Sequence, residues 1–119
     1  MNRQEELNQC SVQRYPPGAG IGVHVDSVLF GDTILGVSLR APATMRFRHK
    51  TTGHRYDVSL QPCSLLVMQG AVRFEWSHEI PGASIHQTRW SVIWRHYKGA
   101  EQRNGPTDRS SPYHFRGSL

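Results

Sequence analysis

The chain has 119 residues, which fits one domain with a single modest hydrophobic core. Its formal net charge of +5 favours contact with polyanions such as nucleic acid, although many small basic domains bind none. No apolar run is long enough to span a bilayer, and two cysteines, Cys10 and Cys63, are too few for a disulfide framework or a zinc site.

The first part of the chain is polar and then becomes extended. Residues 1–8 lack the apolar core of a signal peptide, so we expect a soluble intracellular protein of the cytoplasm or the nucleus. A first strand is predicted at residues 11–15. It ends at the prolines and glycines of residues 16–20, because proline fixes φ and glycine admits positive φ. A second extended piece follows over residues 21–26.

The middle of the chain alternates apolar and polar side chains with a period of two. This pattern is typical of strands with one buried and one wet face, and it occurs at residues 35–40, 44–48 and 55–60. Residues 51–53, Thr-Thr-Gly, lie between two of these stretches and predict a hairpin turn.

The later strands complete an all-β pattern. Residues 64–68 are apolar on both sides and predict a central strand that is covered on both faces. Further strands are expected at residues 73–78 and 88–95. Many short strands without convincing helices predict an antiparallel sandwich or jelly roll. Residues 98–119 are rich in Gly, Ser, Pro and Arg and predict a flexible tail, which leaves residues 1–97 as the domain.

A His-x-Asp pair is the first feature with chemical content. In a strand, His24 and Asp26 project from the same face and can bind one ion together. His78 is the best candidate for a third ligand, because it ends a strand-like run and is followed by a turn with Pro81. Two imidazoles and one carboxylate suit iron(II) and leave coordination positions open. The pair alone is a weak motif, so its weight depends on the rest of the pattern.

A second feature is the segment Arg-Trp-Ser-Val-Ile-Trp-Arg at residues 89–95. If it is a strand, Arg89, Ser91 and Arg95 share one face, and Trp90 and Trp94 share the other. Two inward arginines are costly without an anion, and a dicarboxylate would match their planar forks. Alternation alone equally allows a solvent-exposed face. The short spacing from His78 favours the inward interpretation, since one turn and one strand return the chain to the metal pair.

Together these motifs resemble the AlkB-like branch of the iron(II)/2-oxoglutarate oxygenases, over about residues 8–96. Five ordered blocks carry the resemblance: residues 15–26, 30–39, 64–70, 73–81 and 89–95. The resemblance implies an all-β double-stranded β-helix, or jelly roll, that is short at its N-terminus. It implies iron(II), 2-oxoglutarate and O2 as cofactors and cosubstrates, with His24, Asp26 and His78 as the metal ligands.

The resemblance also implies roles around the cosubstrate. Arg89 and Tyr15 would hold the distal carboxylate of 2-oxoglutarate, and Ser91 would add a hydroxyl. Gln13 stands where the family often has asparagine, and it keeps the amide on a longer stem. Arg95 would lie near the iron, with a catalytic role in supporting Asp26 or the substrate as well as a place in the cosubstrate site.

The implied reaction is oxidative demethylation of N-alkylated nucleobases, with methylated DNA or RNA as the partner. 2-Oxoglutarate and oxygen are consumed, succinate and carbon dioxide leave, and the hydroxylated methyl group departs as formaldehyde. Only 23 residues precede His24, whereas nucleic-acid repair members carry a longer upstream lid. Two alternatives therefore stay open: the same chemistry on a protein side chain or small molecule, and a truncated non-catalytic binding module.

Arg46, Arg48 and Lys50 could contact a nucleic-acid backbone or form a solvated hairpin tip.

Overall fold

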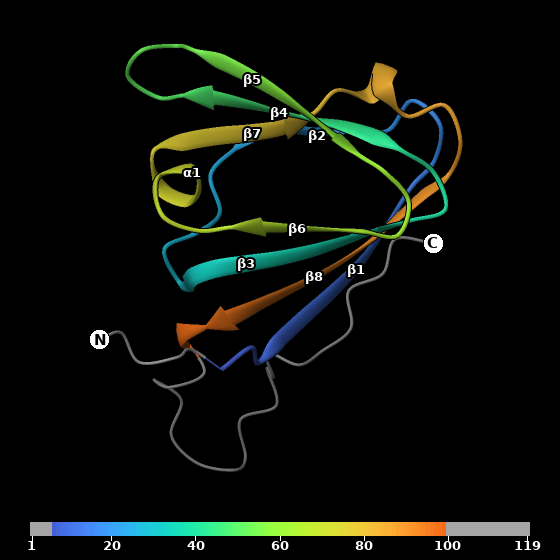
Figure 1. Cartoon of the computed structure of the whole chain (residues 1–119). Coiled ribbons are helices and arrows are strands. Elements are labelled where there is room, and N and C mark those ends of the chain that lie inside the picture. The colour runs from blue at the N-terminus through green and yellow to red at the C-terminus, as the bar shows by residue number, and fades with distance from the viewer. Residues whose placement is uncertain (1–5, 100–119) are drawn as a thin grey trace.

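The structure is a computed structural model that describes residues 6–99 (Figure 1). The described chain contains eight strands, one short α-helix and one 3₁₀ turn. In chain order they are β1 (Gln9–Tyr15), β2 (Ile21–His24), β3 (Phe30–Leu39), β4 (Ala43–His49), β5 (Arg55–Leu60), β6 (Ser64–Met68), α1 (Ala71–Phe74), β7 (Trp76–Ile80), η1 (Gly82–Ser84) and β8 (Arg89–Tyr97).

The strands form two facing antiparallel sheets, ordered β1-β8-β3-β6 and β2-β7-β4-β5. The chain crosses from one sheet to the other at nearly every connection, and the β4–β5 hairpin is the exception within the described residues. Figure 1 shows the two sheets as layers that diverge toward the α1 side. This arrangement confirms the predicted jelly roll. It also places β1 and β8 opposite β2 and β7, the strands that carry the candidate site residues.

Alternate side chains of both sheets meet between the layers and form the core. Alternate side chains of β4 and β5 occupy it as predicted. In β3 the predicted faces are reversed, because Ile34 and Ser38 are buried while the apolar Leu35, Val37 and Leu39 lie on the other face. Burying one such side chain contributes about 1.5–3 kcal/mol. The buried cluster comprises Tyr15, Ile34, Ala43, Met45, Phe47, Leu60, Met68, Ile80 and Ile85.

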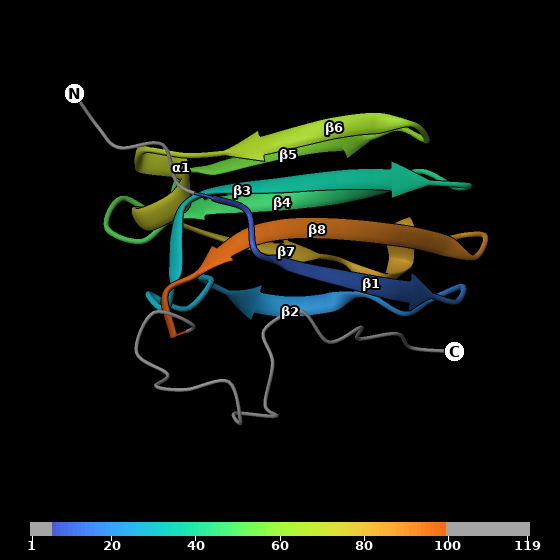
Figure 2. The ribbon, with the colours of Figure 1, turned by 90° about the horizontal axis from the view of Figure 1, so that it is seen from below.

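The prediction that residues 64–68 form a central, doubly covered strand is wrong. β6 is an edge strand that pairs with β3 alone. Leu65 is 60% exposed and Val67 is 43% exposed, because no described element covers the outer face of this sheet (Figure 2). An apolar run signals burial on both faces only where a second layer exists, and the local sequence does not contain that information.

The expected strand at residues 73–78 is only partly correct. Gly70, at a φ of +63°, turns the chain into α1, and the amide of Glu75 then donates to the Ala71 carbonyl at 2.7 Å. β7 begins afterwards, at Trp76. The second predicted strand is likewise shorter than expected, because β2 ends at His24 and leaves Asp26 in the following loop.

Three remaining expectations concern regions beside the strands. The turn at residues 51–53 is confirmed as the β4–β5 hairpin, with Gly53 at a φ of +76°. The predicted tail lies outside the described residues apart from Lys98 and Gly99, and the Lys98 amide donates to the Leu29 carbonyl at 2.7 Å. Neither helical segment of residues 6–99 has the length or apolar composition needed to span a membrane.

The turn from β1 to β2 is packed too closely to accept a side chain at Gly20. A Cβ there would collide with the Ile80 carbonyl oxygen and the Gly82 backbone. We expect Gly20→Ala to lower the free energy of unfolding by about 1–3 kcal/mol, the usual cost of overpacking. Gly22 is the matched control, because a Cβ there meets nothing within 4 Å. Urea denaturation of both variants tests this, and equal loss at the two positions would contradict it.

Candidate metal centre

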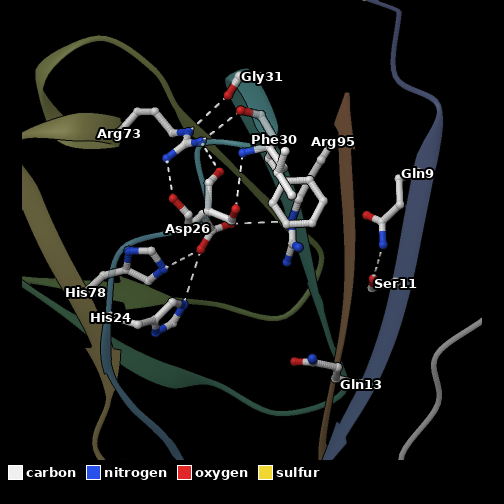
Figure 3. A network of polar contacts seen from close by, with 12 residues as sticks. Gln9, Ser11, Gln13, His24, Asp26, Phe30, Gly31, Arg73, His78 and Arg95 are labelled. Atoms are coloured by element: carbon white, nitrogen blue, oxygen red, sulfur yellow. Dashed lines mark hydrogen bonds and ion pairs between the residues drawn. The ribbon is translucent and has the colours of Figure 1, made fainter. Parts of the chain in front are cut away.

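Three side chains from three segments converge at one end of the space between the sheets (Figure 3). The Nε2 atom of His24 lies 3.2 Å from Asp26 Oδ1, and the Nε2 atom of His78 lies 3.4 Å from the same oxygen. One ligand atom from each residue falls within 4.8 Å of the other two. The structure therefore brings His78 close to His24 and Asp26, as predicted, although more than fifty residues separate them in the sequence.

The pairing of β2 with β7 accounts for this convergence. His24 and His78 are direct register partners in the antiparallel ladder, and their ring centroids lie 4.3 Å apart. Asp26 is two residues beyond the end of β2, so the loop after the strand, rather than the strand itself, directs its carboxylate. Phe47 on β4 pairs with His78 from the other side, and its ring lies 6.0 Å from the imidazole. The His78 ring is thus held between two neighbouring strands.

Charge in the cluster favours an ionised carboxylate. Burial raises the pKa of Asp26, but the imidazoles of His24 and His78 and the guanidinium of Arg95 outweigh it. The net effect holds the pKa of this carboxyl well below its usual range. The hydrogen bond to Asp26 raises the pKa of His24, against the opposing effect of burial. Asp26 is consequently available as an anionic ligand at neutral pH.

Arg95 lies beside the carboxylate and is supported by an aromatic ring. Its Nε atom lies 3.4 Å from Asp26 Oδ2, on the side away from the two imidazoles. Its Cζ atom lies 4.3 Å from the centroid of the Phe30 ring. Arg95 therefore lies near the three candidate ligands and contacts one of them, Asp26.

A pocket of about 250 Å³ opens between the sheets and contains the cluster. Its size lies near the lower limit of roughly 300–1,000 Å³ for small-molecule sites. All eight side chains predicted for the site line it: Gln13, Tyr15, His24, Asp26, His78, Arg89, Ser91 and Arg95. Apolar side chains form much of the remaining wall: Ile21, Ile34, Met45, Leu60, Leu66, Met68, Ile80 and Ile93.

Arg89 points into this pocket and is only partly satisfied by protein groups. It is 3% exposed, and its Nη2 atom donates to Ser38 Oγ at 2.8 Å. Within the described residues its Nε and Nη1 atoms are buried without a hydrogen-bond partner. Burial lowers the pKa of Arg89, and the nearby Tyr15 hydroxyl offsets part of that effect. A buried guanidinium with two unused donors is costly unless an anion binds it.

Three polar residues surround this guanidinium. Tyr15 pairs with Arg89 across β1 and β8, and the Arg89 Cζ atom lies 5.1 Å from its ring centroid. The Tyr15 hydroxyl donates to Gln13 Oε1, so Gln13 orients the tyrosine. Ser91 is 4% exposed and follows on the same face of β8. Four of the five predicted cosubstrate residues therefore share one region, whereas the fifth, Arg95, lies beside Asp26 at the other end of the same strand.

Two contributing residues are not apparent from the sequence reasoning. Ser38 sits on β3 directly opposite Ser91 and accepts a hydrogen bond from the Arg89 guanidinium. Phe30 begins β3 and supports Arg95. Alternation over residues 35–40 predicts Ser38 on the wet face, whereas the structure buries it at 3% exposure, so no local signal indicates its role.

The basic group on the β4–β5 hairpin is largely engaged within the protein. Arg46 Nε lies 3.1 Å from Asp57 Oδ1, and Arg46 Nη1 lies 3.7 Å from Glu79 Oε1. Arg48 donates to the Gly53 carbonyl at 3.4 Å. These contacts favour the interpretation as a solvated hairpin over a surface prepared for a nucleic-acid backbone.

The three candidate ligands fit an iron(II) ion, and Arg89, with two unpaired buried donors, fits a dicarboxylate beside it. Ligands about 2.1 Å from a divalent ion and perpendicular to one another stand about 3 Å apart. The separations of 3.2 and 3.4 Å around Asp26 are close to this value. The two unused donors of Arg89, Nε and Nη1, can each donate to a carboxylate oxygen.

Comparison with known proteins agrees with this chemistry. The family model described as "2OG-Fe(II) oxygenase superfamily" matches residues 2–104. The alkylated DNA repair protein ALKBH8 homolog of Arabidopsis thaliana is 32% identical over 113 residues, covering 75% of this chain and 31% of its own length. The mitochondrial alpha-ketoglutarate-dependent dioxygenase alkB homolog 7 of Bos taurus is 39% identical over 79 residues, covering 65% and 36%.

A solved structure supports the fold. A prolyl-4-hydroxylase of Pseudomonas putida superimposes with a TM-score of 0.54 at 21% identity, over 82% of this chain and 53% of the hydroxylase. The chain spans about a third of the length of these two curated relatives.

Proposed function

Because the chain belongs to the 2OG-Fe(II) oxygenase superfamily, we propose that it is an iron(II)- and 2-oxoglutarate-dependent dioxygenase that demethylates N-alkylated nucleobases in DNA or RNA. One observation carries the first half of this proposal. A cluster of two imidazoles and a carboxylate shares a pocket with a buried arginine that has two unused donors. The pocket thus offers a site for a metal and a site for a diacid side by side.

Each side chain has a specific task in this proposal. His24, Asp26 and His78 would hold the iron, and Arg95 orients the Asp26 carboxylate from the side opposite the imidazoles. Iron(II) with bound 2-oxoglutarate supplies the oxidising chemistry.

The cosubstrate end of the pocket has its own set of residues. Arg89 binds the distal carboxylate of 2-oxoglutarate through the donors that protein groups leave unused. Ser91 adds a hydroxyl to the same carboxylate, and Tyr15 does so when its hydroxyl turns from Gln13 Oε1. The apolar wall limits the access of water to the carboxylate.

The nucleic-acid substrate is supported by charge and by the relatives' names. The net charge of +5 favours a polyanionic partner. One relative is named for repair of alkylated DNA, and another, from Xenopus tropicalis, is named as a tRNA methyltransferase. A base must leave its stack to reach a metal inside such a pocket. The alkB homolog 7 relatives are not named for a nucleic acid, so protein side chains and small molecules are the alternative substrates.

A paired assay tests the substrate. The protein is incubated with iron(II), 2-oxoglutarate and ascorbate, together with oligonucleotides methylated on a base ring nitrogen or with methylated peptides. We expect mass spectrometry to show methyl loss from the oligonucleotide, with formation of succinate, and no change without 2-oxoglutarate. Methyl loss or hydroxylation confined to peptides would overturn the nucleic-acid assignment. Absence of succinate with every substrate would favour a non-catalytic binding module.

A further inference from the structure

Arg73 is a buried charge whose role the metal and cosubstrate sites leave unexplained. It lies in the four-residue helix α1, is 3% exposed and is not part of the pocket wall. Burying a guanidinium is costly, so its contacts need a compensating reason. Figure 3 shows its guanidinium directed at the backbone that surrounds Asp26.

The guanidinium uses all three nitrogens on one stretch of chain, the loop after β2 and the first two residues of β3. Nε donates to the Gly31 carbonyl at 3.0 Å, and Nη1 donates to the Asp26 carbonyl at 3.0 Å. Nη2 donates to the carbonyls of Ser27 at 2.9 Å and Phe30 at 3.1 Å. Four acceptors in a stretch of six residues match the fixed fork of arginine, which a single ammonium cannot reproduce.

The clamped loop begins at a proposed metal ligand. β2 ends at His24, so no ladder hydrogen bond fixes the backbone of Asp26. Arg73 supplies the missing constraint at the Asp26 carbonyl. Through the Phe30 carbonyl it also fixes the aromatic ring on which Arg95 stacks, and Arg95 in turn contacts the Asp26 carboxylate. One guanidinium therefore sets both the backbone and the side-chain partner of the same carboxylate.

We infer that Arg73 is a positioning residue for the metal centre, acting by holding the loop after Asp26 and the start of β3 in the conformation that presents the carboxylate to the ion. The inference rests on the proposed function for the identity of the site as a metal centre. Partners that orient a metal ligand commonly change metal affinity by about 10–100-fold when removed.

The test uses Co(II) as a spectroscopic probe in place of iron, with the full chain. We expect Arg73→Met to weaken Co(II) binding by about 10–100-fold in an absorption titration. Arg73→Lys should stay at least about tenfold weaker than wild type, because it keeps the charge but not the fork. In both variants the amides of residues 27–31 should exchange hydrogen faster than in wild type, since the loop has lost its donors.

Ile85→Ala serves as the matched control. Ile85 is 2% exposed in the core and does not line the pocket. Its truncation should lower stability while leaving Co(II) affinity and exchange in residues 27–31 at their wild-type values. Arg73 variants that bind Co(II) as tightly as wild type would overturn the inference, as would loop exchange no faster than in Ile85→Ala. A wild-type protein that binds no Co(II) would refute the proposed function, and loop exchange would then decide the clamp alone.

Discussion

Asp26→Asn is expected to weaken Co(II) binding by at least about a hundredfold and to abolish succinate formation. Partners that merely orient a ligand change affinity by up to about a hundredfold, so losing the anionic ligand itself should cost more. The substitution keeps the size of the side chain, so the loop can keep its shape. It removes the negative charge that faces His24, His78 and Arg95. Absorption titration with Co(II) and a succinate assay measure the two effects.

Asp57→Asn provides the comparison. Asp57 also carries an ion pair, at 3.1 Å from Arg46, but it lies on β5 and does not line the pocket. Its replacement should leave Co(II) affinity unchanged. If Asp26→Asn bound Co(II) as the Asp57 variant does, the three-ligand assignment would be untenable, whatever the substrate.

The alternation of side chains made most of the sandwich predictable. The strands at residues 44–48 and 55–60 follow from local pattern alone, and so does the strand at residues 35–39, although Arg40 lies beyond its end. The buried face of β3 does not follow, because it carries Ser38 rather than Val37. The error at β6 has a different origin. Leu65 and Val67 are apolar like core residues, yet their exposure depends on whether another layer covers the sheet. Whether such a layer exists depends on the tertiary structure, and local periodicity does not predict it.

The candidate site was predictable where residue type and spacing carry the chemistry. The ligand set predicts that His24, Asp26 and His78 lie together, and alternation with the short spacing from His78 predicts that Arg89 faces inward; the structure has both placements. The residues that support them were not predictable. Phe30 and Ser38 act through partners more than fifty residues away, on β8. Their side chains are common types in a strand, and only the register of β3 against β8 gives them a role.

Arg73 illustrates the same limit at the level of secondary structure. The sequence predicts a strand at residues 73–78, in which the direction of the Arg73 side chain would be set only by its position in the alternation. The positive φ of Gly70 instead produces a helical turn, which directs the guanidinium into the loop after β2. The sequence contains the glycine and the arginine, but not the fact that the loop lies opposite them.

Arg89→Met is expected to separate cosubstrate binding from metal binding. Hydrogen bonds to charged groups contribute about 1.5–3 kcal/mol each, so losing two should weaken 2-oxoglutarate binding by at least about a hundredfold. Co(II) affinity should not change, because the Arg89 guanidinium contacts Ser38 and Tyr15 rather than the three candidate ligands. The KM for 2-oxoglutarate, measured beside a Co(II) titration, gives both quantities.

The same substitution should stabilise the protein without its cosubstrate. Two buried donors of Arg89 lack protein acceptors within the described chain, so methionine removes a desolvation penalty. We expect the free energy of unfolding to rise by about 1 kcal/mol, whereas 2-oxoglutarate should raise the melting temperature of wild type alone. Arg14→Met is the control, because Arg14 lies on the opposite face of β1, paired with Trp90. It should keep the cosubstrate-dependent shift in melting temperature. Loss of that shift in both variants would mean that positive charge on the β1–β8 pair, rather than a guanidinium aimed into the pocket, attracts the diacid.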